Sequence, residues 1–243
     1  SEPTETVPEA RTSRALVTVS VPGRTEAPTA SAKVASPPVP ASIVSDCTLG
    51  TPLIVWPEAA APDLANNLVP YLRGLATEAG SGGSSLVLGI LRAERNRETR
   101  ELEYFNSVLA LGTEVAWYDK HHLVPFAEFF PVPKFVRGWL RMMSLPYSDF
   151  TRGGRNQAPL SVAGLQLAAS VCYEDAYPTT QLGTLERANV LVNVTNDAWF
   201  GRSSARYQHL QISRLRALES RRYLIRAAND GVSAVIGPHG EIV

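Results

Sequence analysis

Three apolar segments of this chain have the length and composition of β-strands, and each leads directly into a chemically reactive side chain. These pairs of segment and side chain are residues 53–56 with Glu58, residues 113–118 with Lys120, and residues 165–171 with Cys172. Open α/β sheets place their sites at the carboxyl ends of the strands, because loops from neighbouring strands meet there. The pattern therefore predicts an α/β fold in which a carboxylate, an ammonium and a thiol converge on one pocket.

Strand-like and helix-like patterns alternate from Pro52 onward, which favours a layered α/β architecture. Leucines recur on one helical face between Asp63 and Ala79, so we predict a helix there with Asp63 as its N-cap. The further predicted helices are residues 131–143, 177–187 and 205–222. The predicted strands are residues 15–21, 52–56, 86–91, 103–111, 113–118, 165–172, 190–194, 223–228 and 232–236. No internal repeat is visible, which favours one large domain.

The N-terminal part of the chain has a different composition. Residues 1–13 are polar and rich in Pro, Glu and Thr, and residues 22–46 are rich in Pro, Ala, Ser and Val without periodicity. We therefore predict a divergent or partly disordered segment and linker over residues 1–46, followed by a folded domain over residues 47–243. The chain lacks an initiator Met and stops at Val243 just after a turn, so we expect a piece of a longer protein, truncated at its C-terminus.

Composition argues against several other classes of protein. The formal net charge is zero, so no overall field favours nucleic acid. Cys47 and Cys172 are too few for a disulfide framework, although a single bridge between them, which would block Cys172, stays open. No apolar run reaches the roughly 18 residues of a membrane span. His121 and His122 have no partner at ligand spacing, so we expect no metal site.

The three side chains at the strand ends suit covalent catalysis. A cysteine accepts an acyl group when a base removes its proton and a cation favours the thiolate. Glu58 is a suitable base in a desolvated site that raises its pKa, and Lys120 can stabilise both a thiolate and an oxyanion. The alternative is that Cys172 is a structural strand residue and that the other two form a surface ion pair. The coincidence of three such residues at three strand ends favours the nucleophilic centre.

The residues around these side chains resemble a known family. Trp56-Pro57-Glu58, the run from Tyr118 to Glu128, and Cys172-Tyr173-Glu174 are similar to the carbon–nitrogen hydrolase (nitrilase) superfamily. Within it, they look like the periplasmic domain of the apolipoprotein N-acyltransferases. Over about residues 50–243, the same resemblance extends to Asn196–Gly201, Gln208-His209, Arg216–Glu219 and Arg226–Ser233.

The resemblance implies a fold and a set of site residues. The expected fold is a four-layer α-β-β-α sandwich of the nitrilase type, with its first strand and helix and its last strands incomplete. Cys172 matches the family's nucleophile, Glu58 its general base and Lys120 its oxyanion-stabilising lysine. The supporting active-site residues implied by the family are Glu128, Tyr173 and Glu174. The expected substrate contacts are Trp56, Trp139, Trp199 and Phe200.

The implied reaction is a two-step acyl transfer that needs no metal and no organic cofactor. Cys172 attacks a phospholipid ester, giving a thioester and a lysophospholipid, and the α-amine of a diacylglyceryl-cysteine at a lipoprotein N-terminus then takes the acyl group. The resemblance also implies a place at the bacterial inner membrane, with this domain facing the periplasm. N-terminal membrane helices, which this chain lacks, would anchor it there.

Residues 129–143 are apolar and aromatic and include Trp139. Ordinary core packing accounts for such a stretch, and a mobile lid that touches the bilayer is the sharper alternative. Two other functions stay open on the sequence. One is a soluble nitrilase-type amidohydrolase that uses the same triad on small amides. The other is an inactive domain that binds lipid or lipoprotein without turnover.

Overall fold

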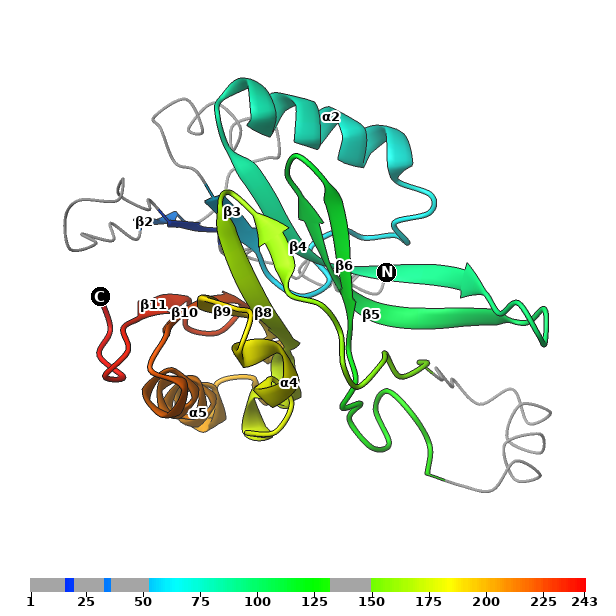
Figure 1. Ribbon diagram of the computed structural model, residues 1–243. Helices are drawn as coiled ribbons and strands as arrows, with labels where there is room; N and C mark the ends of the chain where they lie inside the picture. Colours follow the sequence, from blue (N-terminus) through cyan, green and yellow to red (C-terminus); the bar gives the residue numbers. More distant parts are fainter. Residues whose placement is uncertain (1–15, 20–32, 36–52, 132–149) are drawn as a thin grey trace, which may run out of the picture.

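The computed structural model describes residues 16–19, 33–35, 53–131 and 150–243 (Figure 1). Within these residues, two β-sheets pack face to face, and one long helix covers the outer face of each sheet. Figure 1 shows α2 (Val69–Ser81) above the first sheet and α5 (Ala205–Ser220) below the second. The described part of the chain therefore has the four layers α-β-β-α that the sequence predicts.

The first sheet contains six strands in the order β2-β1-β3-β4-β5-β6. Their bounds are β1 (Leu16–Val19), β2 (Lys33–Ala35), β3 (Leu53–Trp56), β4 (Ser85–Arg95), β5 (Leu102–Leu111) and β6 (Val115–Asp119). Only β3 and β4 run parallel, and the other neighbours are antiparallel. The carboxyl ends of β3 and β6 lead to Glu58 and Lys120.

The second sheet contains five strands in the order β11-β10-β9-β8-β7. Their bounds are β7 (Leu160–Val162), β8 (Leu165–Val171), β9 (Val190–Asn196), β10 (Tyr223–Asn229) and β11 (Ala234–Ile236). The three central strands β8, β9 and β10 are parallel, so their carboxyl ends lie at one edge. Cys172 follows the first of these strands directly.

Alternating side chains divide the core into layers, as the two-residue period of a strand requires. Leu53 and Val55 pack between the two sheets, whereas Ile54 and Trp56 pack on the outer face beneath α2. On the second sheet, Val192 packs between the sheets and Leu191 faces the α5 side. Burial on both faces explains why the central strands are continuous apolar runs.

The helix predicted from Asp63 begins only at Val69. Asp63 caps a preceding turn instead, where its Oδ1 accepts hydrogen bonds from the Leu64 N–H (2.6 Å) and the Asn67 side chain (2.9 Å). Pro70 lies in the first turn of α2, where its missing N–H costs nothing because that donor has no partner inside a helix. The predicted start was therefore wrong, and the proline marks the observed one.

The helix predicted over residues 177–187 is also wrong. The chain forms a 3₁₀ helix, η2 (Cys172–Ala176), and a single short α-helical turn, α4 (Leu182–Leu185). Pro178 disfavours helical backbone at the residue before it, and Tyr177 is accordingly extended with φ −103° and ψ 103°. The strand predicted to end at Cys172 consequently ends at Val171.

Two further predictions are the loop over residues 22–46 and the helix and lid that follow Glu128. Residues 22–46 are predicted as a loop, but Lys33–Ala35 form β2 against β1, and three residues are too few to show a strand pattern. Residues 132–149 lie outside the described residues. They include Trp139 and most of two predicted features, the helix over residues 131–143 and the lid over residues 129–143. In the described part of the chain, no helix has the length and apolar character needed to span a bilayer.

Candidate active site

Glu58, Lys120 and Cys172 come together at the carboxyl ends of β3, β6 and β8. Lys120 Nζ lies 3.8 Å from Glu58 Oε1, and the Cys172 thiol is close enough to both groups for their charges to change its pKa. Lys120 is 1% exposed and Glu58 is 8% exposed. Their ion pair is therefore buried, which argues against the surface pair considered from the sequence.

Glu128 is the closest anionic partner of Lys120. Its two oxygens lie 2.9 and 2.8 Å from Lys120 Nζ, and its Oε2 also accepts the Val124 N–H at 2.9 Å. Burial by itself lowers the pKa of Lys120, but the charges of Glu58 and Glu128 outweigh it and raise that pKa. The lysine therefore remains an ammonium between two carboxylates.

Asn106 on β5 links the two carboxylates, and the sequence analysis missed it. Its Nδ2 donates to Glu58 Oε1 at 2.7 Å and to Glu128 Oε1 at 2.9 Å. Its backbone carbonyl accepts the Lys120 N–H at 2.8 Å. An amide side chain between Phe105 and the apolar run from Val108 was the signal that could have found it, because buried polar groups need partners.

Both sheets hold Glu58. Its Oε2 accepts the backbone N–H of Asn196 from β9 at 2.8 Å, and its carbonyl accepts Nδ2 of Asn229 from β10 at 2.9 Å. Burial raises the pKa of Glu58, and Lys120 and Asn106 partly offset that rise. The carboxyl group is thus fixed in place and made more basic than an exposed glutamate.

Cys172 is the first residue of η2 and has a left-handed backbone, with φ 49°. A left-handed conformation costs a non-glycine residue roughly 1–2 kcal/mol, so it persists only where the surroundings impose it. The side chain is a free thiol. Its carbonyl accepts His209 Nε2 at 3.3 Å and Asn193 Nδ2 at 3.4 Å. These two hydrogen bonds therefore hold the turn that carries the thiol.

The Cys172 thiol is strongly disfavoured as a thiolate in the resting structure. Burial raises its pKa to about 12, and the charge of Glu58 contributes to that rise. Lys120 and a hydrogen bond with Thr195 act in the opposite direction. A thiol with this pKa stays protonated at neutral pH, so it needs a base during attack. Glu58 is the buried carboxylate beside it.

Glu174 connects the nucleophile turn to the lysine loop. This fully buried carboxylate accepts the Val171 N–H at 2.9 Å and the His121 and His122 N–H groups at 2.7 and 2.9 Å. It also accepts the Tyr118 hydroxyl at 2.9 Å. Glu174 therefore fixes two of the three strand ends relative to each other.

Tyr173, by contrast, is an exposed neighbour of the thiol. Its hydroxyl accepts a hydrogen bond from the Tyr177 hydroxyl at 2.8 Å, and the Tyr177 ring stacks on His122 with centroids 4.5 Å apart. These rings form a small aromatic surface beside the nucleophile turn.

A buried ionic cluster lies beneath Cys172, and it was not predicted. Its members are Asp175 on η2, Asp197 on η3 (Asp197–Phe200), His209 on α5 and Arg226 on β10. Arg226 is 0% exposed and donates to Asp197 Oδ2 at 2.9 Å. His209 Nδ1 lies 2.7 Å from Asp197 Oδ1, and Nε2 lies 3.0 Å from Asp175 Oδ1. The arginine within an apolar strand was a signal for this cluster.

The carboxylates of Asp175 and Asp197 favour the imidazolium form of His209. Burial by itself lowers its pKa, but hydrogen bonds to Asp175 and Asp197 raise that pKa to about 9. An imidazolium donates from both nitrogens, which matches the carboxylate oxygen found against each one. The cluster therefore balances two cations with two carboxylates.

The pH dependence of stability should report this charge state. Because the pKa of folded His209 is raised from 6.5 to about 9, its stabilisation is complete below the lower value and lost as the pH rises through the upper one. We expect the free energy of unfolding to fall by about 3 kcal/mol over that interval, relative to His209→Gln. Urea unfolding of both proteins measures this. Parallel curves would contradict the assignment.

The predicted substrate contacts lie in different settings. Trp199 is 82% exposed and Phe200 is 40% exposed, both on η3 just after β9. Phe126 is also exposed, on the loop between Lys120 and Glu128. Trp56 instead packs in the core beneath α2, because its position in β3 points it to the outer face of the sheet. It offers almost no surface to a substrate, so the predicted contact at Trp56 is wrong.

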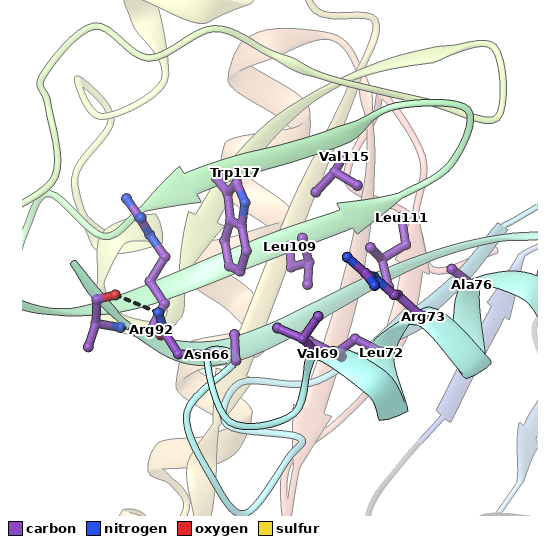
Figure 2. Close-up of a pocket in the computed structure, with 12 residues that line it drawn as sticks. Asn66, Val69, Leu72, Arg73, Ala76, Arg92, Leu109, Leu111, Val115 and Trp117 are labelled. Atoms are coloured by element: carbon purple, nitrogen blue, oxygen red, sulfur yellow. Dashed lines mark hydrogen bonds between the residues drawn. The ribbon is translucent and has the colours of Figure 1, made fainter.

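A cavity of about 320 Å³ lies elsewhere, between α2 and the outer face of the first sheet (Figure 2). Val69, Leu109 and Trp117 are among the residues that line it. The outer face of this sheet is opposite to the face that packs on the second sheet and Cys172. The cavity is therefore separate from the candidate active site.

Comparison with known proteins identifies the family to which the chain belongs. A family model described as carbon–nitrogen hydrolase matches residues 40–243, and the chain belongs to that family. Curated relatives named apolipoprotein N-acyltransferase are similar to it. The protein from Chromobacterium violaceum is 45% identical over 196 residues, covering 78% of this chain and 36% of the relative. The protein from Nitrosomonas europaea is 45% identical over 195 residues, covering 79% and 38%. The chain thus spans little more than a third of these relatives.

Solved structures share the fold at low sequence identity. A carbon–nitrogen hydrolase from Helicobacter pylori has a TM-score of 0.61 at 17% identity, covering 83% of this chain and 76% of that one. The NitFhit protein of C. elegans has a TM-score of 0.60 at 19% identity, covering 82% and 51%. These similarities confirm the predicted nitrilase-type fold.

Proposed function

We propose that this chain is the catalytic domain of an apolipoprotein N-acyltransferase. Cys172 is its nucleophile, Glu58 its general base and Lys120 its oxyanion-stabilising cation. The observation that carries the proposal is the Cys172 thiol beside the buried ion pair of Glu58 and Lys120. The similarity to curated relatives bearing that name supports the choice of substrate. The substrates are then a phospholipid and a diacylglyceryl-lipoprotein, at the periplasmic side of the bacterial inner membrane.

In the first step, the Cys172 sulfur attacks the ester carbonyl of the phospholipid while Glu58 takes the thiol proton. A carbon–sulfur bond forms and the ester carbon–oxygen bond breaks. Glu58 returns the proton to the departing glycerol oxygen, so a lysophospholipid leaves and an acyl thioester remains. The raised pKa of Glu58 suits a group that must both accept and return a proton near neutral pH.

The oxyanion of this step has two donors. Lys120 supplies a charge, and the backbone N–H of Tyr173 supplies a dipole. In a trans peptide, the carbonyl of one residue and the N–H of the next point in opposite directions. The Cys172 carbonyl points at His209, so the Tyr173 N–H points away from His209. An N–H in the first turn of a helix also lacks an acceptor within that helix, which leaves it available to substrate.

In the second step, the α-amine of the lipoprotein cysteine attacks the thioester carbon. Glu58 removes a proton from the attacking nitrogen, the carbon–sulfur bond breaks and an amide forms. The proton passes to the sulfur, which restores the neutral thiol. The buried setting disfavours the free thiolate, so the return of the proton is favourable.

The surface around the site suits a lipid better than a small amide. Trp199, Phe200 and Phe126 are exposed on the loops that border it. Exposed apolar side chains that lie close together often mark a surface that binds an apolar partner, such as a lipid. A soluble amidohydrolase acting on small amides has less use for such a border, although it would use the same three side chains.

The test compares the two chemistries in the full-length protein. We expect transfer of a labelled acyl chain from phospholipid to a diacylglyceryl-cysteine peptide, without ammonia release from small amides. Trp199→Ser should raise the KM for phospholipid, whereas Tyr71→Ser, on an exposed position of α2, should not. Ammonia release without acyl transfer would favour the amidohydrolase. Binding of lipid with neither activity would favour an inactive domain.

Asn106 should tune the base. In Asn106→Leu, Glu58 and Glu128 lose their shared donor, so burial raises the pKa of Glu58 further. We expect the acidic limb of the pH–kcat profile to move to higher pH. Asn67→Leu, at an exposed position, is the matched control and should leave the limb in place. An unmoved limb in Asn106→Leu would mean that the amide does not act on Glu58.

A further inference from the structure

The buried ionic cluster and two polar side chains bonded to it reach the nucleophile at three points. His209 Nε2 and Asn193 Nδ2 both lie near the Cys172 carbonyl, at 3.3 and 3.4 Å. Thr195 hydrogen-bonds with the thiol and, at 3.1 Å, with Asp197 Oδ1. The mechanism above uses none of these cluster side chains as acid, base or nucleophile. They nevertheless hold the one residue that reacts.

We propose that Asp175, Asp197, His209 and Arg226 form a positioning device that fixes the peptide between Cys172 and Tyr173. His209 is the member that contacts this peptide, and the two aspartates orient the imidazole. Arg226 in turn fixes Asp197. The proposal rests on the proposed function, since it assigns the fixed peptide to the oxyanion of the acyl-transfer reaction.

The hydrogen-bond network supports a positioning role. Arg226 also donates to Asn193 Oδ1 at 2.8 Å and to Ser213 Oγ at 2.9 Å. Through these contacts the cluster joins η2, η3, α5, β9 and β10. Buried ion pairs often contribute little net stability, because desolvation offsets their attraction. Their directional hydrogen bonds do fix geometry, and here they end on the strained backbone of Cys172.

Space around the cluster is tight. Gly231 lies directly against Asp197, because a Cβ at position 231 would overlap Asp197 Oδ2. A displaced Asp197 would lose its hydrogen bonds to both Arg226 and His209. The contact between His209 and the Cys172 carbonyl is therefore fixed by residues on η3, α5, β9 and β10.

The test uses two amides in place of His209. In His209→Gln, the amide nitrogen takes the place of Nε2 and can still donate to the Cys172 carbonyl, whereas in His209→Asn it takes the place of Nδ1 and cannot. Both substitutions remove the positive charge. The probe is p-nitrophenyl acetate, whose acylation of Cys172 needs an oxyanion donor but no lipid or lipoprotein. His239→Gln, at an exposed position, is the control.

We expect the maximal acylation rate of His209→Asn to fall on the order of 10²-fold, the usual effect of misplacing an oxyanion donor. The half-saturating ester concentration should not change, because the oxyanion exists only in the transition state. His209→Gln should stay within about tenfold of the original rate, since it keeps the contact. Equal losses in both variants would overturn the proposal, because charge rather than the carbonyl contact would then matter.

A second measurement applies if neither variant folds. Nitrogen NMR of the unmodified protein should show protons on both ring nitrogens of His209 at neutral pH, and the Nε2 signal should shift when Cys172 is acylated. An unprotonated Nε2, or an Nε2 signal that does not change when Cys172 is acylated, would overturn the proposal. The ester probe also separates it from the proposed function. A protein that is acylated by the ester but not by phospholipid would refute the function and leave the positioning role intact.

Discussion

Glu58→Gln is expected to lower kcat for acyl transfer by about 10²–10⁴-fold while making the Cys172 thiol easier to ionise. The rate falls because the variant has no base to take the thiol proton. The thiol pKa falls because the charge of Glu58 is one of the causes that raise it to about 12 in the intact protein. The measurements are kcat with phospholipid and the pH midpoint of Cys172 alkylation by iodoacetamide.

These opposite effects distinguish a catalytic base from a residue that only shapes the pocket. Glu78→Gln is the matched control, since Glu78 is exposed on α2. It should change neither kcat nor the alkylation midpoint. An alkylation midpoint that rose in Glu58→Gln, or a kcat that stayed unchanged, would contradict the role of Glu58.

Lys120→Met is expected to damage both the reaction and the fold. Loss of the ammonium removes an oxyanion donor, which lowers kcat by about 10²–10³-fold. It also leaves Glu58 and Glu128 buried without their cation, at a cost of about 3–5 kcal/mol in the free energy of unfolding. The pKa of Glu58 should rise further, because the charge of Lys120 no longer offsets its burial.

The direction of the pH dependence follows from the raised pKa of Glu58. A carboxyl whose folded pKa lies above its unfolded value contributes stability at low pH and loses it as the pH rises through the folded pKa. Lys120→Met should therefore lose the most stability at alkaline pH and approach the original protein under acidic conditions. Urea unfolding across the pH range measures this, with the exposed Arg187→Met as control. A deficit that was constant with pH would mean that the pKa of Glu58 does not depend on Lys120.

The strand ends of the candidate site were predictable because they follow local patterns. The apolar runs that precede Glu58, Lys120 and Cys172 are long enough to be recognised as strands, and a common edge for their carboxyl ends follows from the architecture. The start of α2 and the break at Tyr177 were predictable too. Pro70 and Pro178 carry the necessary signals, whereas the leucine periodicity that begins at Leu64 starts before α2 itself.

The supporting side chains could not be assigned from local pattern. Asn106 contacts Glu58 across 48 positions of the chain, and Arg226 contacts Asp175 across 51. Contacts between distant positions depend on the packing of two sheets, which periodicity does not specify. His209 and Arg226 belong to motifs visible in the sequence, but only the structure places Asp197 between them. The prediction for Trp56 was wrong because the sequence alone does not say which face of β3 turns toward the second sheet.

Mass spectrometry of Cys172 after exposure of the full-length protein to phospholipid tests the central claim most directly. We predict one added acyl chain on the peptide that contains Cys172, released by hydroxylamine as a thioester should be and absent from Cys172→Ala. Transfer of an acyl group to the lipoprotein peptide by the Cys172→Ala variant would contradict the covalent mechanism. So would transfer by the unaltered protein if its Cys172 stayed unmodified throughout turnover.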